Sequence, residues 1–334
     1  MARILQSDPA HLDLLAHHLA AGGIAAVPTE TVYGLAGHAL DPAAVAKIFA
    51  VKGRPRRNPL IVHVLDWEGV EAIAAVTDPD RLIGERFWPG PLTLILKKKS
   101  SIPASVTAGL DTVAVRMPSH PLFRALLRRC SFPLAAPSAN PFGYISPTRP
   151  EHVETALGQS IDYILDGGPC EGGIESTIVS LLEPDEPKLL RQGAIALESL
   201  EEKLGKSIHL SREVAGEDPA RGLLSPGLME RHYSPHTLLR TFRGRLPKTG
   251  KGDAIVFLNA ASCREEHHFA LSADGRLSTG KGTPPFTWRF RRGMVWPPPF
   301  AIAWTGLRPR TRTIHYTFIR SIYHDNNDRC QMTS

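Results

Sequence analysis

The chain has 334 residues, of which 42% are hydrophobic and 22% are charged. The apolar residues lie in short runs along the whole chain. This composition is typical of globular proteins and excludes a mainly disordered or membrane-spanning chain, since no run approaches the roughly 20 apolar residues of a span. The net charge of +6 is weak evidence for nucleic-acid binding, because residues 276–334 hold ten Lys or Arg against two Asp or Glu, and the remainder is slightly acidic.

Helices are predicted over residues 8–21, 41–49 and 121–129, where apolar residues recur at helical spacing after a proline. Strands are predicted over the short apolar runs 24–27, 60–64, 93–96, 112–116, 134–136, 161–165 and 177–181. Strands that alternate with helices predict an α/β domain, here over residues 1–204.

Residues 205–236 combine Gly, Pro, Ser and charged residues with little periodicity, which predicts a linker. A small second domain is predicted over residues 237–334, with a strand at 253–258. From about residue 276 the composition changes. Residues 276–324 contain no acidic residue, hold three of the five tryptophans and show no helical or strand period.

The cysteines and the N-terminus bear on the cellular compartment. Cys130, Cys170, Cys263 and Cys330 are scattered without CxxC or metal-ligand spacing, so we expect reduced thiols and no zinc site. The first residues lack a basic segment followed by an apolar stretch, so we expect no secretory signal and a cytoplasmic protein without membrane contact.

Two polar clusters flank the early strands. Thr29, Thr31 and Gly34 follow the first predicted strand, where small residues let a ligand approach the backbone, although an ordinary turn has the same composition. The second cluster precedes the strand at 60–64 and consists of Lys52, Arg54, Arg56, Arg57 and Asn58. Such a run is most often a solvated face, yet loops beside buried strands also bind ligands, and a planar guanidinium suits phosphate. His63 lies within the strand, where spacing alone favours a packed core residue.

Further clusters follow the later strands. Arg116 ends one strand, as either an anion contact or a surface ion pair. Residues 135–140 with Ser146 place small hydroxyl and amide groups where they suit a nucleotide pocket. The glycine-rich stretch 167–177 matches neither GxxxxGK[ST] nor GxGxxG. Because no catalytic triad or HExxH stands out, the clusters favour binding and charge neutralisation over covalent catalysis.

Eight motifs of the chain, in this order, resemble the YrdC-like threonylcarbamoyl-AMP synthase family in its long, two-domain form. They are PTETVYGL (28–35), KGRPRRNPLIVH (52–63), FWPGPLT (87–93), VAVRMP (113–118), APSAN (136–140), GGIESTIV (172–179), LLRQGAI (189–195) and SPGLMERHYSP (225–235). The resemblance covers residues 8–236 and implies a twisted mixed sheet with flanking helices. It also implies that the linker forms a lid over the active site.

The resemblance implies an activity and its residues. L-threonine, bicarbonate or CO₂ and ATP with Mg²⁺ would give threonylcarbamoyladenylate and pyrophosphate, for a transferase that modifies tRNA beside the anticodon. The family's threonine contacts match Thr31, His63, Arg116, Ala136 and Ser176. Its ATP contacts match Arg54, Asn58, Thr112, Ser138, Asn140, Ser146, Arg191 and Tyr233. Lys52 and Arg54 would stabilise charge, with no covalent nucleophile and no metal ligand from the chain.

The C-terminal region departs from the long form, in which the second domain is a small α/β unit. Residues 253–258 and 271–277 fit that unit, but the Trp-, Pro- and Arg-rich continuation does not. We hypothesise a truncated second domain whose reading frame shifts at about residue 276, which the intact mass of the native protein would test.

Two other functions compete with the synthase. A non-catalytic protein that binds tRNA or double-stranded RNA would use a basic concave face and the Arg- and Trp-rich tail. A carbamoyl-transfer module like that of hydrogenase maturation proteins would need acylphosphatase and zinc-finger segments, which this sequence lacks. The near-neutral body and the complete threonine and phosphate clusters favour the enzyme.

Overall fold

The computed structural model describes residues 1–211 and 225–226 with their side chains, and the backbone of five later strands. These residues fall into two units, one formed by the residues up to 226 and the other by the five strands.

The first unit is an α/β structure. Its described helices are α1 (Pro9–Ala20), α2 (Pro42–Lys52), α3 (Trp67–Ile73), α4 (Asp78–Phe87), α5 (Pro121–Arg129), α6 (Pro150–Leu157) and α7 (Leu197–Leu204). Its described strands are β1 (Arg3–Leu5), β2 (Ile24–Val27), β3 (Gly34–His38), β4 (Ile61–His63), β5 (Ala74–Ala75), β6 (Leu92–Lys98), β7 (Thr112–Arg116), β8 (Leu134–Ala135), β9 (Tyr163–Leu165), β10 (Thr177–Ser180), β11 (Lys188–Arg191) and β12 (His209–Leu210).

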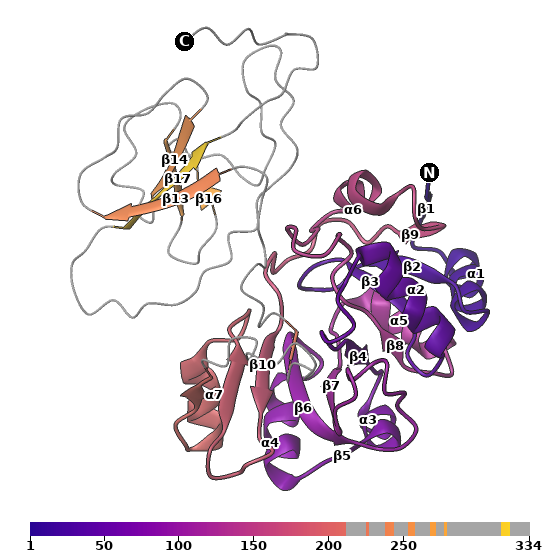
Figure 1. Cartoon of the computed structure of the whole chain (residues 1–334), viewed down its shortest axis with the longest axis horizontal. Coiled ribbons are helices and arrows are strands. Elements are labelled where there is room, and N and C mark those ends of the chain that lie inside the picture. Colours follow the sequence, from indigo (N-terminus) through magenta and orange to yellow (C-terminus); the bar gives the residue numbers. More distant parts are fainter. Residues whose placement is uncertain are drawn as a thin grey trace, which may run out of the picture. The chain divides into compact units, whose positions relative to one another are not determined.

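The strands form one mixed sheet in the order β1-β9-β2-β3-β8-β4-β7-β6-β10-β11-β12, with β5 paired to β6. The sheet combines parallel pairs such as β4 with β7 and β6 with β10 with antiparallel pairs such as β8 with β4 and β7 with β6. Figure 1 shows α1, α2 and α5 beside β2, β3 and β8, and α4 and α7 beside β6 and β10. The expected mixed sheet with flanking helices is confirmed.

The two faces of the sheet bury different side chains, because neighbouring residues of a strand point to opposite faces. One face packs on a large apolar cluster to which α2, α3, α4, α6 and α7 all contribute. The other face is covered by α1 and α5 over β2 and β8. Farther along this second face, β4, β6, β7 and β10 carry the small cluster of Ile61, Ile95, Ala114 and Ile178. No described helix contributes to that cluster, and a polar pocket lined in part by Ile61 lies there.

Local sequence explains the predicted helices. The Asp8 carboxylate accepts a hydrogen bond from the backbone N–H of His11 at the start of α1, where Pro9 follows it. The side chain of Asp41 caps α2 in the same way, and Gly53 ends that helix in the left-handed conformation with φ of 59°. All seven predicted strands have counterparts, from β2 to β10.

The linker prediction needs one correction at its start. Residues 209 and 210 form β12, which pairs with β11 in parallel and so belongs to the sheet of the first unit. Ser225 and Pro226 are described, and Ser225 is fully buried. Tyr233 and the other residues of the predicted lid lie outside the described residues.

The second unit contains a five-stranded sheet among the described residues. Its order is β13 (Leu238–Arg243), β17 (His315–Arg320), β14 (Asp253–Phe257), β15 (His268–Leu271) and β16 (Leu277–Ser278). β14 confirms the predicted strand at 253–258. The prediction that residues 276–324 lack a strand period is wrong for β17, which pairs antiparallel with both β13 and β14. Its Tyr, Thr, Phe and Ile residues favour extended structure.

Among the residues that the structure describes, we find no helix both long and apolar enough to cross a bilayer.

Candidate functional site

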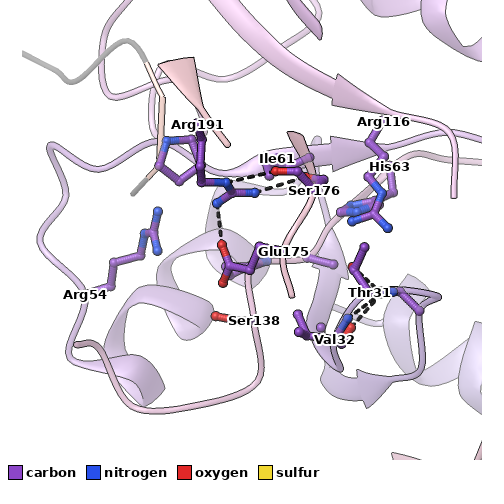
Figure 2. Close-up of a pocket in the computed structure, with 15 residues that line it drawn as sticks. Thr31, Val32, Arg54, Ile61, His63, Arg116, Ser138, Glu175, Ser176 and Arg191 are labelled. Atoms are coloured by element: carbon purple, nitrogen blue, oxygen red, sulfur yellow. Dashed lines mark hydrogen bonds and ion pairs between the residues drawn. The ribbon is translucent and has the colours of Figure 1, made fainter. Parts of the chain in front are cut away.

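A polar pocket of about 510 Å³, counting its part open to solvent, lies on the second face of the sheet. Figure 2 shows its arginines arriving from different elements, with Arg116 beside His63 and Arg54 on the far side. The lining residues are Thr29, Thr31, Val32, Gly34, Arg54, Ile61, His63, Arg116, Ala136, Pro137, Ser138, Glu175, Ser176, Arg191 and Pro226.

The sheet register places His63 beside Arg116. They are partners across the parallel strands β4 and β7, and both end their strands at the same edge. Arg116 is 4% exposed, and its Nη2 donates a hydrogen bond of 2.6 Å to Oε1 of Glu30. The His63 ring packs against Phe123 of α5, with centroids 5.4 Å apart. His63 is therefore the packed core residue that its spacing favours, and it also lines the pocket.

Burial and the Arg116 charge decide the protonation of this end of the pocket. Burial, aided by the guanidinium of Arg116, lowers the pKa of His63 to about 3, so the imidazole is neutral at pH 7. Burial acts to raise the pKa of Glu30, but the ion pair and hydrogen bond with Arg116 outweigh it, and the pKa of Glu30 lies below its usual value. The Glu30 carboxylate is therefore ionised and neutralises Arg116.

The turn between β2 and β3 is organised by one hydroxyl. Thr29 Oγ1 donates to the carbonyl of Val32 at 2.6 Å and accepts from the backbone N–H groups of Thr31 and Val32, both at 3.1 Å. It also lies 2.8 Å from Thr31 Oγ1. This Thr29 turn fixes Thr31 against the pocket, so the cluster is both an ordered turn and a pocket wall.

Arg54 lines the opposite end of the pocket, where Asn58 holds it. Arg54 Nε donates to the Asn58 carbonyl at 3.0 Å, and Arg54 Nη2 donates to Asn58 Oδ1 at 2.6 Å. Asn58 is fully buried, so its place is to orient Arg54, and the alternative of a solvated face is wrong for both residues.

Lys52 is buried behind this end and does not line the pocket. Its ammonium donates to the carbonyls of Ser138 and Asn140, which ties the end of α2 to the loop after β8. Burial and the neighbouring Arg54 charge lower the pKa of Lys52 well below its usual value. Its observed hydrogen bonds hold the loop after β8 in place.

Glu175 joins three segments at the centre of the pocket. Its carboxylate forms an ion pair with Arg191 at the end of β11 and accepts a hydrogen bond of 2.9 Å from Ser146 Oγ. Arg191 Nε donates to the Ser176 carbonyl and Arg191 Nη2 to Ser176 Oγ, each at 3.0 Å. A Cβ at Gly193 would overlap the backbone of residues 175–177, so only glycine lets β11 approach the start of β10 this closely.

Most, but not all, of the predicted threonine and ATP contacts line the pocket. It is lined by all five predicted threonine contacts, namely Thr31, His63, Arg116, Ala136 and Ser176, and by the predicted ATP contacts Arg54, Ser138 and Arg191. Lys52, Asn58 and Ser146 contact lining residues without lining the pocket. Asn140 bonds its own loop at Pro141 and Tyr144. Thr112 begins β7, about 13 Å of strand before Arg116, and is not a lining residue.

Sequence reasoning missed Glu30 and Glu175, which pair with the two arginines Arg116 and Arg191. Both lie inside matched motifs, PTETVYGL and GGIESTIV, so an acidic residue within each polar motif was the available signal. The sequence reasoning also gave no role to Thr93, whose hydroxyl lies 2.8 Å from Ser176 Oγ.

The described residues contain no group of three or more His, Cys, Asp or Glu side chains that could hold a metal ion. Glu175 is the carboxylate among the residues lining the pocket, and Arg191 and Ser146 engage it. The site therefore offers guanidinium groups, hydroxyls and a neutral imidazole in a concave, mainly buried place, which suits a small anionic ligand.

The mixed sheet and its arginine-lined pocket define an α/β protein with a site for a small polar molecule. The Sua5/YciO/YrdC family model, described as "Telomere recombination", matches residues 17–193. The chain belongs to this family.

Relatives and a solved structure extend the likeness. A threonylcarbamoyl-AMP synthase of Pyrococcus abyssi is 45% identical over 217 residues, which cover 64% of this chain and 62% of the relative. One of Bacillus subtilis is 45% identical over 223 residues, covering 66% and 63%. The match thus spans less than two thirds of these curated relatives. The crystal structure of P. abyssi Sua5 complexed with L-threonine is similar with a TM-score of 0.67 at 41% identity, over 70% of this chain and 69% of that one.

Proposed function

We propose that the chain synthesises L-threonylcarbamoyladenylate from L-threonine, bicarbonate or CO₂ and ATP, with release of pyrophosphate. The observation that carries the proposal is the pocket, in which five predicted threonine contacts and three predicted ATP contacts meet. The relatives named threonylcarbamoyl-AMP synthase and the L-threonine complex of a similar protein support the same substrates.

The residues suit a reaction that needs positioning more than a protein nucleophile. The threonine amine would capture CO₂ as a carbamate, and a carbamate oxygen would attack the α-phosphate and expel pyrophosphate. In this proposal Arg54 and Arg191 face the phosphates and offset the charge that develops on them. The neutral His63, with Arg116, Thr31 and Ser176, would orient the amino acid for attack.

Mg²⁺ would enter with the nucleotide. Because the described pocket residues do not form a carboxylate site, they do not fit a resident Mg²⁺, and phosphate oxygens would hold the ion instead. In the same proposal the lid carrying Tyr233 closes over ATP and keeps water from the adenylate. Pro226, from the start of that segment, lines the pocket, which supports a lid at this place.

The product would be handed to a threonylcarbamoyl transferase and its complex, which modify the adenosine beside the tRNA anticodon. We also propose the cytoplasmic location that this role requires. Direct contact with tRNA or double-stranded RNA is a separate proposal, for which the basic segment after residue 276 is the candidate.

Pyrophosphate release from ATP tests the function. We expect release that depends on both L-threonine and bicarbonate. Release without L-threonine, or none at all, contradicts the proposal, and absence of release together with tight binding of RNA would favour the RNA-binding alternative.

Substitution of Arg54, with Arg56 as the matched control, tests the proposed ATP site. Arg54→Ala removes a guanidinium held by Asn58 and Pro59 at the pocket, so we expect kcat/KM for ATP to fall about ten- to a hundredfold, the range for charge-assisted hydrogen bonds. Arg56→Ala, two residues away and exposed, should leave turnover unchanged. Equal turnover of Arg54→Ala and the wild type would remove Arg54 from the ATP site.

A further inference from the structure

Two pairs of buried hydroxyls stand at the pocket. Both residues of the first pair line it, whereas in the second Ser176 lines it and Thr93 does not. Thr31 is paired with Thr29 at 2.8 Å, and Ser176 is paired with Thr93 at 2.8 Å. Figure 2 shows Thr31 on the side of His63 and Ser176 on the side of Arg191. Because a hydroxyl has one proton and two lone pairs, the partners of each pair decide which atom donates.

In the first pair the hydroxyl proton of Thr29 is already donated to the carbonyl of Val32. Thr29 Oγ1 lies 2.6 Å from the carbonyl oxygen of Val32, which can only accept, so the Thr29 proton lies on that contact. The backbone N–H groups of Thr31 and Val32 also reach Thr29 Oγ1, at the longer distance of 3.1 Å, so that oxygen is a shared acceptor. The Thr31 hydroxyl must still donate to Thr29 Oγ1, since two oxygens at 2.8 Å without a proton between them would repel. Thr31 Oγ1 therefore meets the pocket with lone pairs only, as a hydrogen-bond acceptor.

In the second pair the supporting residue has one acceptor within reach. Thr93 is fully buried in β6, and Ser176 Oγ is the partner that the described residues give its hydroxyl. A buried hydroxyl proton without an acceptor would cost about 1–3 kcal/mol, so Thr93 donates to Ser176. Arg191 Nη2 also donates to Ser176 Oγ, at 3.0 Å. Both lone pairs of Ser176 are then used, and its proton is left for an acceptor in the pocket.

We propose that Thr29 and Thr93 are positioning residues that set the direction of hydrogen bonding in the pocket, making Thr31 an acceptor and Ser176 a donor. The inference rests on the proposed function and specifies how the amino acid is oriented. A substrate N–H or O–H group faces Thr31, and a substrate oxygen without a proton faces Ser176. The reversed orientation places lone pair against lone pair at Thr31 and proton against proton at Ser176, so the pocket rejects it.

The test is the binding of L-threonine and of ATP, each measured by calorimetry on the full chain. Thr29→Val keeps the shape of the side chain and removes the oxygen that receives the Thr31 proton. We expect the Kd for L-threonine to rise about three- to tenfold, the loss of one neutral hydrogen bond, with the Kd for ATP unchanged. Thr29→Ser restores the oxygen and should bind L-threonine like the wild type. Thr93→Val and Thr93→Ser, within a buried strand, form a second matched pair with the same expected order.

A double-mutant cycle separates positioning from general damage to the turn. If Thr29 acts through the Thr31 hydroxyl, Thr29→Val adds no further loss of L-threonine affinity in a Thr31→Val background. Additive losses, a loss of ATP affinity equal to that of L-threonine, or unchanged binding in both valine variants would overturn the inference.

The outcomes also separate this inference from the proposed function. A wild-type chain that binds L-threonine but releases no pyrophosphate contradicts the function and leaves the inference standing. Unchanged binding in the valine variants, with threonine-dependent pyrophosphate release by the wild type, overturns only the inference. A wild-type chain that does not bind L-threonine overturns both.

Discussion

His63 illustrates how a single residue can be packed in the core and also line a pocket. It is 2% exposed, packs on Phe123 and lies in register with Arg116 at the edge of the pocket. A neutral imidazole next to a guanidinium can hydrogen-bond a substrate without adding charge to a site that already holds three arginines. The same burial makes the free energy of unfolding depend on pH.

The sign of that dependence follows from the lowered pKa of His63. The unfolded chain binds a proton at this residue near pH 6.5, whereas the folded chain does so only near pH 3. Between these values the unfolded state binds more protons, so stability is lost as the pH falls, by up to about 1.4 kcal/mol per pH unit. We expect His63→Gln to abolish this contribution. The free-energy gap between wild type and variant, from urea unfolding at several pH values, should shrink steadily below about pH 6.5.

Phe123→Leu is the control for this titration, because it disturbs the same packing without removing an ionisable group. Its gap from the wild type should stay constant with pH. A His63→Gln gap that is also independent of pH would show that His63 is protonated equally in the folded and unfolded states.

Individual residues also mark the limit of what the sequence predicts. The motifs led to Thr31, His63, Arg116 and Ser176, because they lie at strand ends in recognisable strings. Thr93 could not be assigned, since its partner Ser176 is 83 residues away and the contact depends on the parallel register of β6 and β10. Thr112 was matched only by its position directly before the motif VAVRMP, and the direction of β7 carries it away from the pocket lining.

At the scale of elements, the approach of β11 to the start of β10 holds the centre of the site together. This approach brings Arg191 onto Ser176 and Glu175, and it requires a residue without Cβ at position 193. Gly193→Ala would force the two segments apart, so we expect a loss of stability of about 1–3 kcal/mol and at least a tenfold loss of L-threonine affinity. Thermal unfolding and calorimetry of the same preparations measure both effects.

Gly109→Ala is the matched control among the described residues. Gly109 has a φ of 82° and no atom within 4 Å of an added Cβ, so alanine there is strained but unhindered. A comparable loss of stability of about 1–2 kcal/mol is expected, without any change in L-threonine affinity. If the two variants bind L-threonine equally well, the close approach at Gly193 does not shape the site.

Helices and strands were predictable where residues within or next to them mark their bounds. Residues 121–129 and 112–116 were predicted with the bounds that the structure has, because Pro121 and a β-branched run mark them. β3 was not predicted, since its sequence GLAGH lacks strand-forming residues and its pairing with β2 and β8 imposes the extended form. β12 was assigned to the linker for the same reason, because only pairing with β11 makes it a strand.

For the whole molecule, the α/β class followed from the alternation of strands and helices, and the division near residue 236 is a prediction from composition. The order of the sheet did not, because it depends on pairings between segments as distant as β1 and β9. The proposal of two domains predicts two cooperative units, of which only the first contains described residues that line the pocket.

Ligand-linked stability tests that division. L-threonine at about 100 times its Kd should stabilise the unit that binds it by about 2.7 kcal/mol, which slows amide exchange through global opening about a hundredfold. We expect this protection in strands such as β4, β7 and β10 and none in β13 or β14, measured by hydrogen–deuterium exchange on the full chain. D-threonine, with the same composition but the opposite hand, should protect neither unit. Equal slowing in both units would mean that they unfold together, and the proposed domain boundary would then be wrong, because ligand binding stabilises every part of a single cooperative unit.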